Sequence, residues 1–515
     1  MGGGLLQLAA YGAQDVYLTG NPQITFWKVV YRRYTNFAME SIEQNFDSDM
    51  AFGKTKLVCT LSRSGDLVHK IWLQVNLGDP NVNENGAPRG TKTETYDHAV
   101  QNSDGVNITL TPQSGTLTGT YLTRTGTGNS WLWSGEANNT IYQVAPAPEA
   151  SKTRLTYSGT SDGVDYFSST STSVVYIDGQ ETYYWAKNIG FLLIQSIDIE
   201  IGGIKIDKHY GEWMHLMWKY TLPHGKTELA GPELLGEESY LDSGNNTLFI
   251  PLQFWFCRNP GLAIPIIALQ YHEIKLNLEV RALNQLVVKS GDVDATSGEA
   301  RTYETISNYT GKPTISGNFW VDYIYLDPDE RRRFAQISHE YLIEQVQSIG
   351  TKAADIIPLS NQGTHTQKLV FNHPVKELIW TLSEKVDQTE SFDEFFSYGY
   401  SDAGENGSPI YLKTARLTLN GNDRIKERHE KYYRIVQPFQ HHTRYPTGVN
   451  NVFFYSFALK PEEHQPSGTC NFSRIDNAEL KISYSTTTDL ILKVHAWNYN
   501  VLKISSGMAG LAFTN

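Results

Sequence analysis

Residues 197–210 read IDIEIGGIKIDKHY, and this stretch indicates the fold class of the chain. Isoleucines alternate with acidic residues from 197 to 201, the period of two that puts apolar side chains on one face of a β-strand. Gly202 and Gly203 follow, and alternation resumes at Ile204. Because glycine adopts the positive φ of a tight primed turn without steric cost, the stretch predicts a β-hairpin.

The same alternation recurs along the chain and predicts a mainly β protein. Residues 71–77 (IWLQVNL) and 274–280 (IKLNLEV) alternate most regularly. Further strands are expected near residues 319–326, 368–381, 411–419, 452–459, 478–484 and 490–504. We expect few helices: one in the aromatic-rich residues 208–220, and a short charged surface helix at 423–434 (DRIKERHEKYYR).

Two regions share one plan without sharing much sequence. A strand ending at Phe256 leads through a Pro/Gly loop into the strand at 274–280. A strand ending at Leu459 leads through a similar loop into the strand at 478–484. This repetition suggests two copies of one β-sandwich. The boundary is expected near Asp327-Pro328-Asp329, because proline breaks the preceding strand.

Residues 79–183 differ in composition from the rest of the chain. They are rich in Thr, Ser, Gly and Asn, with isolated aromatics such as Trp131 and Tyr157. A disordered segment usually carries fewer aromatic and β-branched residues. We therefore expect an exposed insertion built of short strands and hairpins.

Bulk composition excludes several classes of protein. The 515 residues suggest more than one domain. The net charge of −12 opposes direct binding to phosphates. Three scattered cysteines form no CxxC pair, so we expect buried free thiols and a reducing compartment. We find neither an apolar run long enough to cross a membrane nor a secretory signal.

Several motifs resemble catalytic or ligand-binding sequences, but an ordinary structural role explains each of them better. His224-Gly225-Lys226-Thr227 lacks the glycine that a phosphate loop needs, so we expect a turn there. Adjacent His441 and His442 would point to opposite faces of a strand, so we expect polar surface or interface histidines. The acidic pairs Glu237-Glu238 and Glu462-Glu463 are typical of solvated loops, and residues 252–256 (LQFWF) of a buried strand. No catalytic, cofactor or metal site is expected.

Ordered motifs along the chain resemble the major capsid proteins of nucleocytoplasmic large double-stranded DNA viruses, the group with algal and amoebal members. The resemblance lies in residues 1–37 and 466–515, and in IGGIKIDKHY (201–210), NPGLAIPIIALQYHEIKL (259–276), VDYIYLD (321–327), HEYLIEQ (339–345) and YSFALKP (455–461). It implies an all-β fold of two tandem eight-stranded jelly rolls, a double jelly roll, with a large loop insertion in the first. We expect the first at residues 25–327, carrying the 79–183 insertion, and the second at 335–515.

The resemblance also implies a function in shell building. The chain would be a structural capsid protein, not an enzyme, that forms homotrimeric pseudo-hexagonal capsomers tiling an icosahedral virion. Its partners would be neighbouring capsomers and minor capsid or penton proteins, without direct nucleic-acid contact. It would have no transmembrane segment but an indirect link to an inner viral membrane. Assembly would take place in the host cytoplasm. The alternative is a carbohydrate-binding or carbohydrate-cleaving β-sandwich protein.

Assembly contacts are expected near the N-terminus. Residues 1–24 are rich in glycine and predict an assembly arm, against the plainer alternative of a locally packed terminus. Tyr31-Arg32-Arg33-Tyr34 fits an interface between copies, ordinary surface, or a short single-strand nucleic-acid contact. The candidate interface residues are Gly2, Gly3, Gly4, Tyr31, Arg32, Arg33 and Tyr34.

Overall fold

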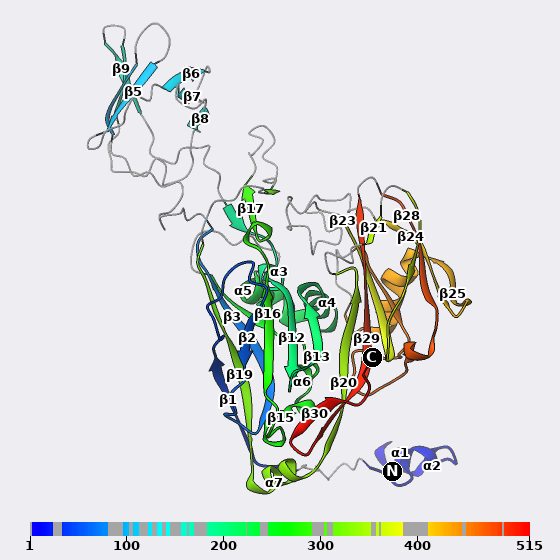
Figure 1. Ribbon diagram of the computed structural model, residues 1–515. Helices are drawn as coiled ribbons and strands as arrows, with labels where there is room; N and C mark the ends of the chain where they lie inside the picture. The colour runs from blue at the N-terminus through cyan, green and yellow to red at the C-terminus, as the bar shows by residue number, and fades with distance from the viewer. Residues whose placement is uncertain are drawn as a thin grey trace.

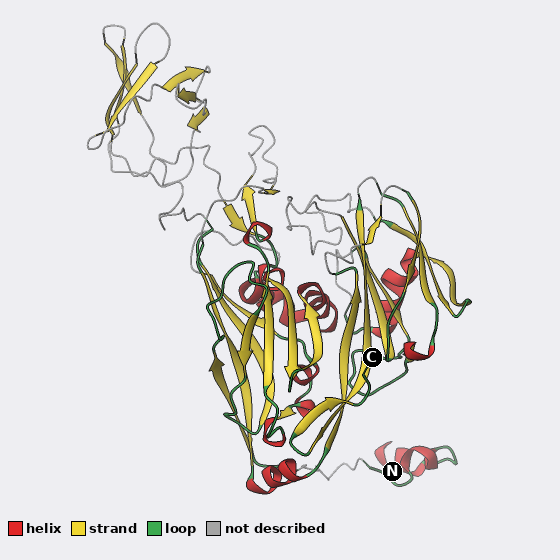
Figure 2. Ribbon diagram, viewed as in Figure 1, coloured by secondary structure: helices red, strands yellow, loops and turns green. Residues whose placement is uncertain are grey.

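The computed structural model contains two β-sandwiches that lie side by side (Figure 1). It describes residues 3–23, 33–80, 183–222, 224–236, 246–290, 313–351, 362–384, 410–444, 450–486 and 489–514, with short strands between 96 and 168, at 303–305 and at 357–359. Figure 2 shows that strands form both sandwiches and that the helices are short.

The first sandwich consists of two antiparallel sheets. One has the order β1 (Phe37–Gln44), β19 (Ile315–Leu326), β3 (Leu67–Leu77), β14 (Asn246–Pro251), with β15 (Ile264–Pro265) also pairing with β3. The other has the order β13 (Ile204–Tyr210), β12 (Ile194–Ile201), β16 (Ile274–Val280), β2 (Leu57–Thr60).

The second sandwich repeats this arrangement. One sheet has the order β20 (His339–Ile349), β29 (Leu490–Ser505), β23 (Pro374–Glu384), β26 (Val452–Ser456), with additional pairing by β21 (Ile357–Leu359), β27 (Cys470–Asn471) and β30 (Met508–Leu511). The other has the order β22 (Gly363–Lys368), β28 (Ala478–Tyr484), β24 (Leu412–Leu419), β25 (Asn422–His429).

Both sandwiches have one topology. When the eight main strands of each are numbered in chain order, both contain one sheet with the order 1-8-3-6 and a second with the order 2-7-4-5. Eight antiparallel strands in two facing sheets form a jelly roll. The expected all-β double jelly roll is therefore present, and the repeated plan read from the sequence corresponds to strands six and seven of each half.

The alternation read from the sequence correctly predicts which strand residues are buried in the core. In β16 the residues Ile274, Leu276, Leu278 and Val280 are buried and alternate with half-buried polar residues. Burying each such side chain contributes about 1.5–3 kcal/mol. The hairpin between β12 and β13 is also as expected: Gly202 has φ +58° and Gly203 φ +82°, and Ile201 faces Ile204 across the ladder.

The insertion contains the expected short strands. β4 to β10 form one antiparallel sheet, with the bounds Tyr96–Gln101, Asn107–Pro112, Leu122–Thr125, Trp131–Gly135, Ile141–Val144, Thr156–Ser161 and Val164–Ser168. Figure 1 draws these strands beyond one end of the first sandwich. A small sheet of β11 (Tyr183–Trp185), β17 (Val287–Ser290) and β18 (Tyr303–Thr305) accompanies them.

Helices connect the strands. The α-helices are α1 (Gly3–Ala9), α2 (Asp15–Thr19), α3 (Ile189–Leu193), α4 (Gly211–Thr221), α5 (His224–Leu235), α6 (Trp255–Arg258), α7 (Pro328–Gln336) and α8 (Gln437–His441). Short 3-10 segments are η1 (Pro260–Leu262), η2 (Ile266–Ala268), η3 (Leu283–Gln285) and η7 (Phe472–Arg474), and η6 (Tyr432–Val436) is a π-helix. α4 is the helix expected in the aromatic-rich segment.

Three local predictions are wrong. Residues 422–429 form the strand β25 rather than a surface helix. The pattern was misleading because this edge strand buries only Ile425 and so shows no apolar alternation. Residues 252–256 are buried as expected, but β14 ends at Pro251 and α6 begins at Trp255. Residues 224–227 begin α5 instead of forming a turn.

Candidate assembly surfaces and the contact between the sandwiches

The N-terminal helices α1 and α2 bury none of their residues. They expose a set of large apolar side chains: Leu5, Leu6, Leu8, Val16, Tyr17 and Leu18. Of the expected assembly residues, Gly3 and Gly4 lie in α1, whereas Gly2 lies outside the described residues. Figure 1 draws the two helices apart from both sandwiches. The exposed apolar side chains are a surface that burial against another molecule would stabilise.

The segment that leads into β1 is also exposed. Arg33 is exposed and Tyr34 is 85% exposed, while Tyr31 and Arg32 lie outside the described residues. Within β1 itself, only Gln44 is fully buried, and Phe37 and Met39 are about half exposed. This edge of the first sandwich therefore leaves apolar surface uncovered.

An ion pair between Glu212 and Lys493 crosses the contact between the two sandwiches. Glu212 in α4 lies 2.8 Å from Lys493 Nζ on β29, and the side chains are 3% and 5% exposed. Thr381 Oγ1 on β23 donates a hydrogen bond of 2.9 Å to the same carboxylate. Burial raises the pKa of Glu212, but the charges of Lys493 and His495 and these hydrogen bonds outweigh it and hold the pKa below its ordinary value.

A second buried group of charges lies around Glu344 on β20. One carboxylate oxygen is 3.0 Å from Arg258 Nη1 in α6 of the first sandwich, and the other is 2.7 Å from Lys376 Nζ. The Lys376 ammonium lies 3.3 Å from the centre of a Trp497 ring, over its face, and Arg258 stacks on the same side chain. Burial lowers the pKa of Lys376 to about 8, although Glu344 opposes this shift.

Apolar and backbone contacts complete this boundary. Trp213 of the first sandwich meets Trp497 of the second with ring centres 5.8 Å apart. Gln345 Nε2 donates to the Ile206 carbonyl, and the amide of Val346 donates to Asp207 Oδ1 at 3.2 Å. Breaking one partner of a buried ion pair typically costs about 3–5 kcal/mol. The two sandwiches are thus held together as one block.

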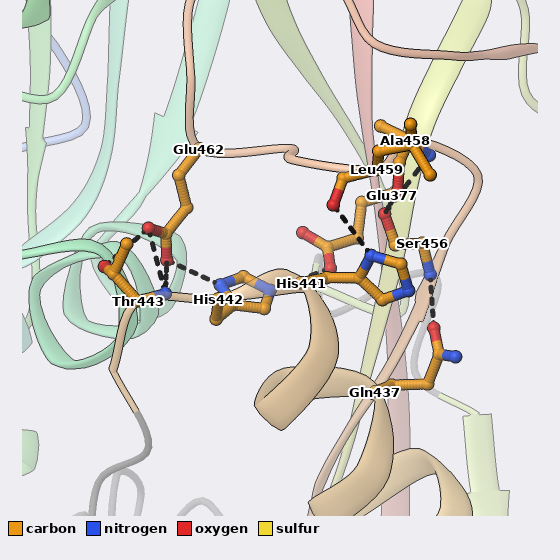
Figure 3. Close-up of polar contacts among 9 residues, drawn as sticks. All are labelled: Glu377, Gln437, His441, His442, Thr443, Ser456, Ala458, Leu459 and Glu462. Carbon is orange, nitrogen blue, oxygen red and sulfur yellow. Dashed lines mark hydrogen bonds and ion pairs between the residues drawn. The ribbon is translucent and has the colours of Figure 1, made fainter. Parts of the chain in front are cut away.

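The histidine pair differs from expectation. α8 ends at His441, and the His442 side chain is fully buried between two glutamates, with Nε2 2.8 Å from Glu377 Oε1 and Nδ1 2.8 Å from Glu462 Oε1 (Figure 3). Burial lowers the pKa of His442, but the charges and hydrogen bonds of both glutamates outweigh it and raise the pKa to about 9. The surface reading is wrong for His442, because its partners come from distant strands and loops.

The expectation that Glu462 is a solvated loop residue is also wrong. Its side chain is 10% exposed and also accepts a hydrogen bond of 2.6 Å from Thr443 Oγ1 (Figure 3). Only Glu463, paired with Lys460 at 2.9 Å, is the solvated acid that the sequence suggested. Glu237 and Glu238 lie outside the described residues.

The remaining chemical groups have structural surroundings. Cys59 and Cys257 are buried free thiols as expected, whereas Cys470 is only half-buried. Burial raises the pKa of both Cys59 and Cys257 to about 12. Among the described residues, no cluster of three or more His, Cys, Asp or Glu could hold a metal ion. No helix in the described part of the chain is long and apolar enough to cross a membrane.

Family models match both halves of the chain. Residues 330–510 match the large eukaryotic DNA virus major capsid protein, and residues 25–102 and 161–327 match the major capsid protein N-terminus. The major capsid protein of Pyramimonas orientalis virus is 38% identical over 100% of both chains. That of Paramecium bursaria Chlorella virus 1 is 34% identical, again over 100% of both.

Solved structures agree. A chain of a quasi-atomic model of the PBCV-1 virus capsid has 28% sequence identity and a TM-score of 0.59, with 95% of this chain and 100% of that chain covered. The Faustovirus major capsid protein, 13% identical with a TM-score of 0.60 over 96% of this chain and 94% of that one, shares the fold. The relatives that are 38% and 34% identical are major capsid proteins, which decides against the alternative of a carbohydrate-binding or carbohydrate-cleaving sandwich. The chain belongs to the family of major capsid proteins of large eukaryotic DNA viruses.

Proposed function

We propose that three copies of the chain form a capsomer of pseudo-hexagonal outline that tiles the facets of an icosahedral shell. The observation that carries this proposal is the pair of sandwiches with identical strand order, held as one block by buried ion pairs. Three such blocks around a threefold axis present six similar sandwiches, which nearly satisfies sixfold lattice contacts.

The proposed division of the chain follows from the strand order. The first jelly roll comprises residues 25–327 and the second 335–515, with α7 between the last strand of one and the first strand of the other. The family matches, which end at 327 and resume at 330, support this division. The insertion at 79–183 is proposed as the outer tower of the capsomer. Antibodies raised against it should bind intact particles, and failure to bind would contradict this placement.

Residues 1–24 are proposed as an assembly arm. α1 and α2 bury none of their residues, so an arm of this composition gains stability only against a partner. Gly2, Gly3 and Gly4 belong to this arm, and the following Tyr31-Arg32-Arg33-Tyr34 segment to an interface between copies. The exposure of Arg33 and Tyr34 supports the second assignment.

The partners in a particle would be neighbouring capsomers and minor capsid or penton proteins, with an indirect link to an inner viral membrane. Assembly in the host cytoplasm fits the free, largely buried thiols. The net charge of −12 favours contact with proteins over contact with the genome.

The mass of the purified chain in solution tests the trimer. Light scattering coupled to size-exclusion chromatography should give three times the chain mass over a range of concentrations. A protein that stays monomeric under all conditions that support particle assembly would overturn the proposal.

A further inference from the structure

The contact between the two sandwiches brings together two particular strands, and the same strand relation can be repeated between copies. Strand five of the first sandwich, β13, lies beside strand one of the second, β20 (Figure 1). Ile206 and Asp207 of β13 receive hydrogen bonds from Gln345 and Val346 of β20. The two sandwiches share one topology. A ring of several copies that repeats this relation therefore puts strand five of the second sandwich of one copy beside strand one of the first sandwich of the next copy.

Those two strands are sheet edges, and within the described part of the chain neither has a strand paired to its outer side. β1 ends one sheet of the first sandwich, and β25 ends one sheet of the second. In β25 only Ile425 is buried, and in β1 only Gln44. Exposed edges invite pairing or packing with other chains, so proteins usually cover or charge them.

The two edges have opposite charge. β25 exposes Arg424, Lys426 and Arg428, and β1 exposes Glu40 and Glu43. The acids of β25 are already engaged within their own sheet: Asp423 pairs with Arg416 Nη2 at 2.5 Å, and Glu427 accepts from Thr414 at 2.6 Å. Arg424 and Arg428 lie over the rings of Tyr455 and Tyr432 of their own sandwich, 6.0 and 4.4 Å from the ring centres, yet both side chains stay exposed. Their charges can therefore still be reached by acids on another molecule.

The contact inside the chain also pairs an acid on strand one with a cation of the other sandwich, although this cation comes from α6 and not from strand five. Glu344 on β20, strand one of the second sandwich, receives the cation Arg258 from the first sandwich at 3.0 Å. On strand one of the first sandwich, Glu40 accepts a hydrogen bond from the Tyr325 hydroxyl and Glu43 accepts one from the Asn318 amide. Neither carboxylate forms an ion pair with a cation of the described residues. Cations from a preceding copy would complete the pattern.

We propose that β25 of one copy packs against β1 of the next, with Arg424, Lys426 and Arg428 facing Glu40 and Glu43, and that this contact closes the ring. The inference rests on the proposed trimer and names the strands that form it. Phe37 and Met39 on β1 then lose their exposure in the assembled capsomer. A head-to-tail contact of this kind forms a closed ring when its rotation matches the symmetry.

Charge reversal on each strand tests the pairing. R424E/K426E on β25 and E40K/E43K on β1 should each raise the concentration at which trimers dissociate by at least about tenfold. The four substitutions combined should restore the trimer, because the charges are then exchanged. K413E, at an exposed position of the neighbouring strand β24, is the matched control and should leave the trimer intact.

Thermal unfolding of each variant separates loss of assembly from loss of fold, since all of these side chains are exposed. Reversal variants that stay trimeric would overturn the strand assignment while leaving the trimer proposal standing. Dissociation by both reversals without rescue by the combined exchange would overturn the pairing of these two strands. A wild-type chain that never forms trimers would refute the proposed function itself.

Discussion

Replacing His442 with glutamine should destabilise the protein at neutral pH and have little effect above about pH 9.5. The imidazolium is fully buried between Glu377 and Glu462, and its pKa rises from 6.5 to about 9 on folding. A shift of roughly 2.5 units at 1.36 kcal/mol per unit corresponds to about 3 kcal/mol. Because the folded-state pKa is raised, this stabilisation is complete below the unfolded pKa and is lost as the pH rises through about 9.

Thermal unfolding of wild type and H442Q across this pH range measures the effect. About 3 kcal/mol corresponds to a Tm difference of roughly 6–12 °C for a unit of 150–250 residues. Lys376 contributes in the opposite direction, since its folded pKa of about 8 lies below the ordinary value of 10.5. Its contribution cancels when the two proteins are compared at each pH. H441Q changes the adjacent, partly exposed histidine and is the matched control, because it leaves His442 and both glutamates in place.

A Tm difference between wild type and H442Q that stays constant from about pH 6 to 9.5 would refute the reasoning. It would mean that His442 does not carry the buried charge. A small difference at every pH would mean instead that the two glutamates do not need a cation.

Three further predictions concern the boundary between the sandwiches, the hairpin between β29 and β30, and the N-terminal arm. E212Q should lower the free energy of unfolding by about 3–5 kcal/mol because it leaves Lys493 buried opposite a neutral group, whereas E212Q/K493M should cost much less. Chemical denaturation of the wild type, both single variants and the double variant measures these free energies. Losses that simply add in the double variant would contradict the prediction. G507V should lower Tm, because Gly507 has φ +80° and an added Cβ would lie 2.7 Å from the Tyr271 ring. G510A is the control, because the space around Gly510 is open. Equal Tm values for the two variants would count against the reasoning. Deletion of residues 1–24 should leave the circular dichroism spectrum and Tm unchanged but impair particle assembly, and normal particles from the deleted protein would rule out an assembly arm.

Strand positions could be predicted from the sequence wherever one face of a strand is buried. β16 has the predicted bounds because its apolar residues alternate strictly. The turn between β12 and β13 also lies where it was predicted, because two glycines permit its positive φ angles. β25 could not be predicted in this way, since Ile425 is its only buried residue and its charges have no period that distinguishes strand from helix.

The buried charges escaped prediction because their partners are far apart in the sequence. Glu212 and Lys493 are brought together only when the two sandwiches pack. One signal was present in the sequence: Lys493 interrupts an apolar run between Leu492 and Val494, both fully buried. A lysine within such a strand is rarely buried unless it is paired, so it indicates a partner without saying which one.

A cryo-electron microscopy reconstruction of the protein's own assembly tests the central claim most directly. We predict a threefold ring of six sandwiches in which β25 of each copy lies against β1 of the next. A shell unit with another symmetry, or a ring in which β1 remains exposed to solvent, would contradict it.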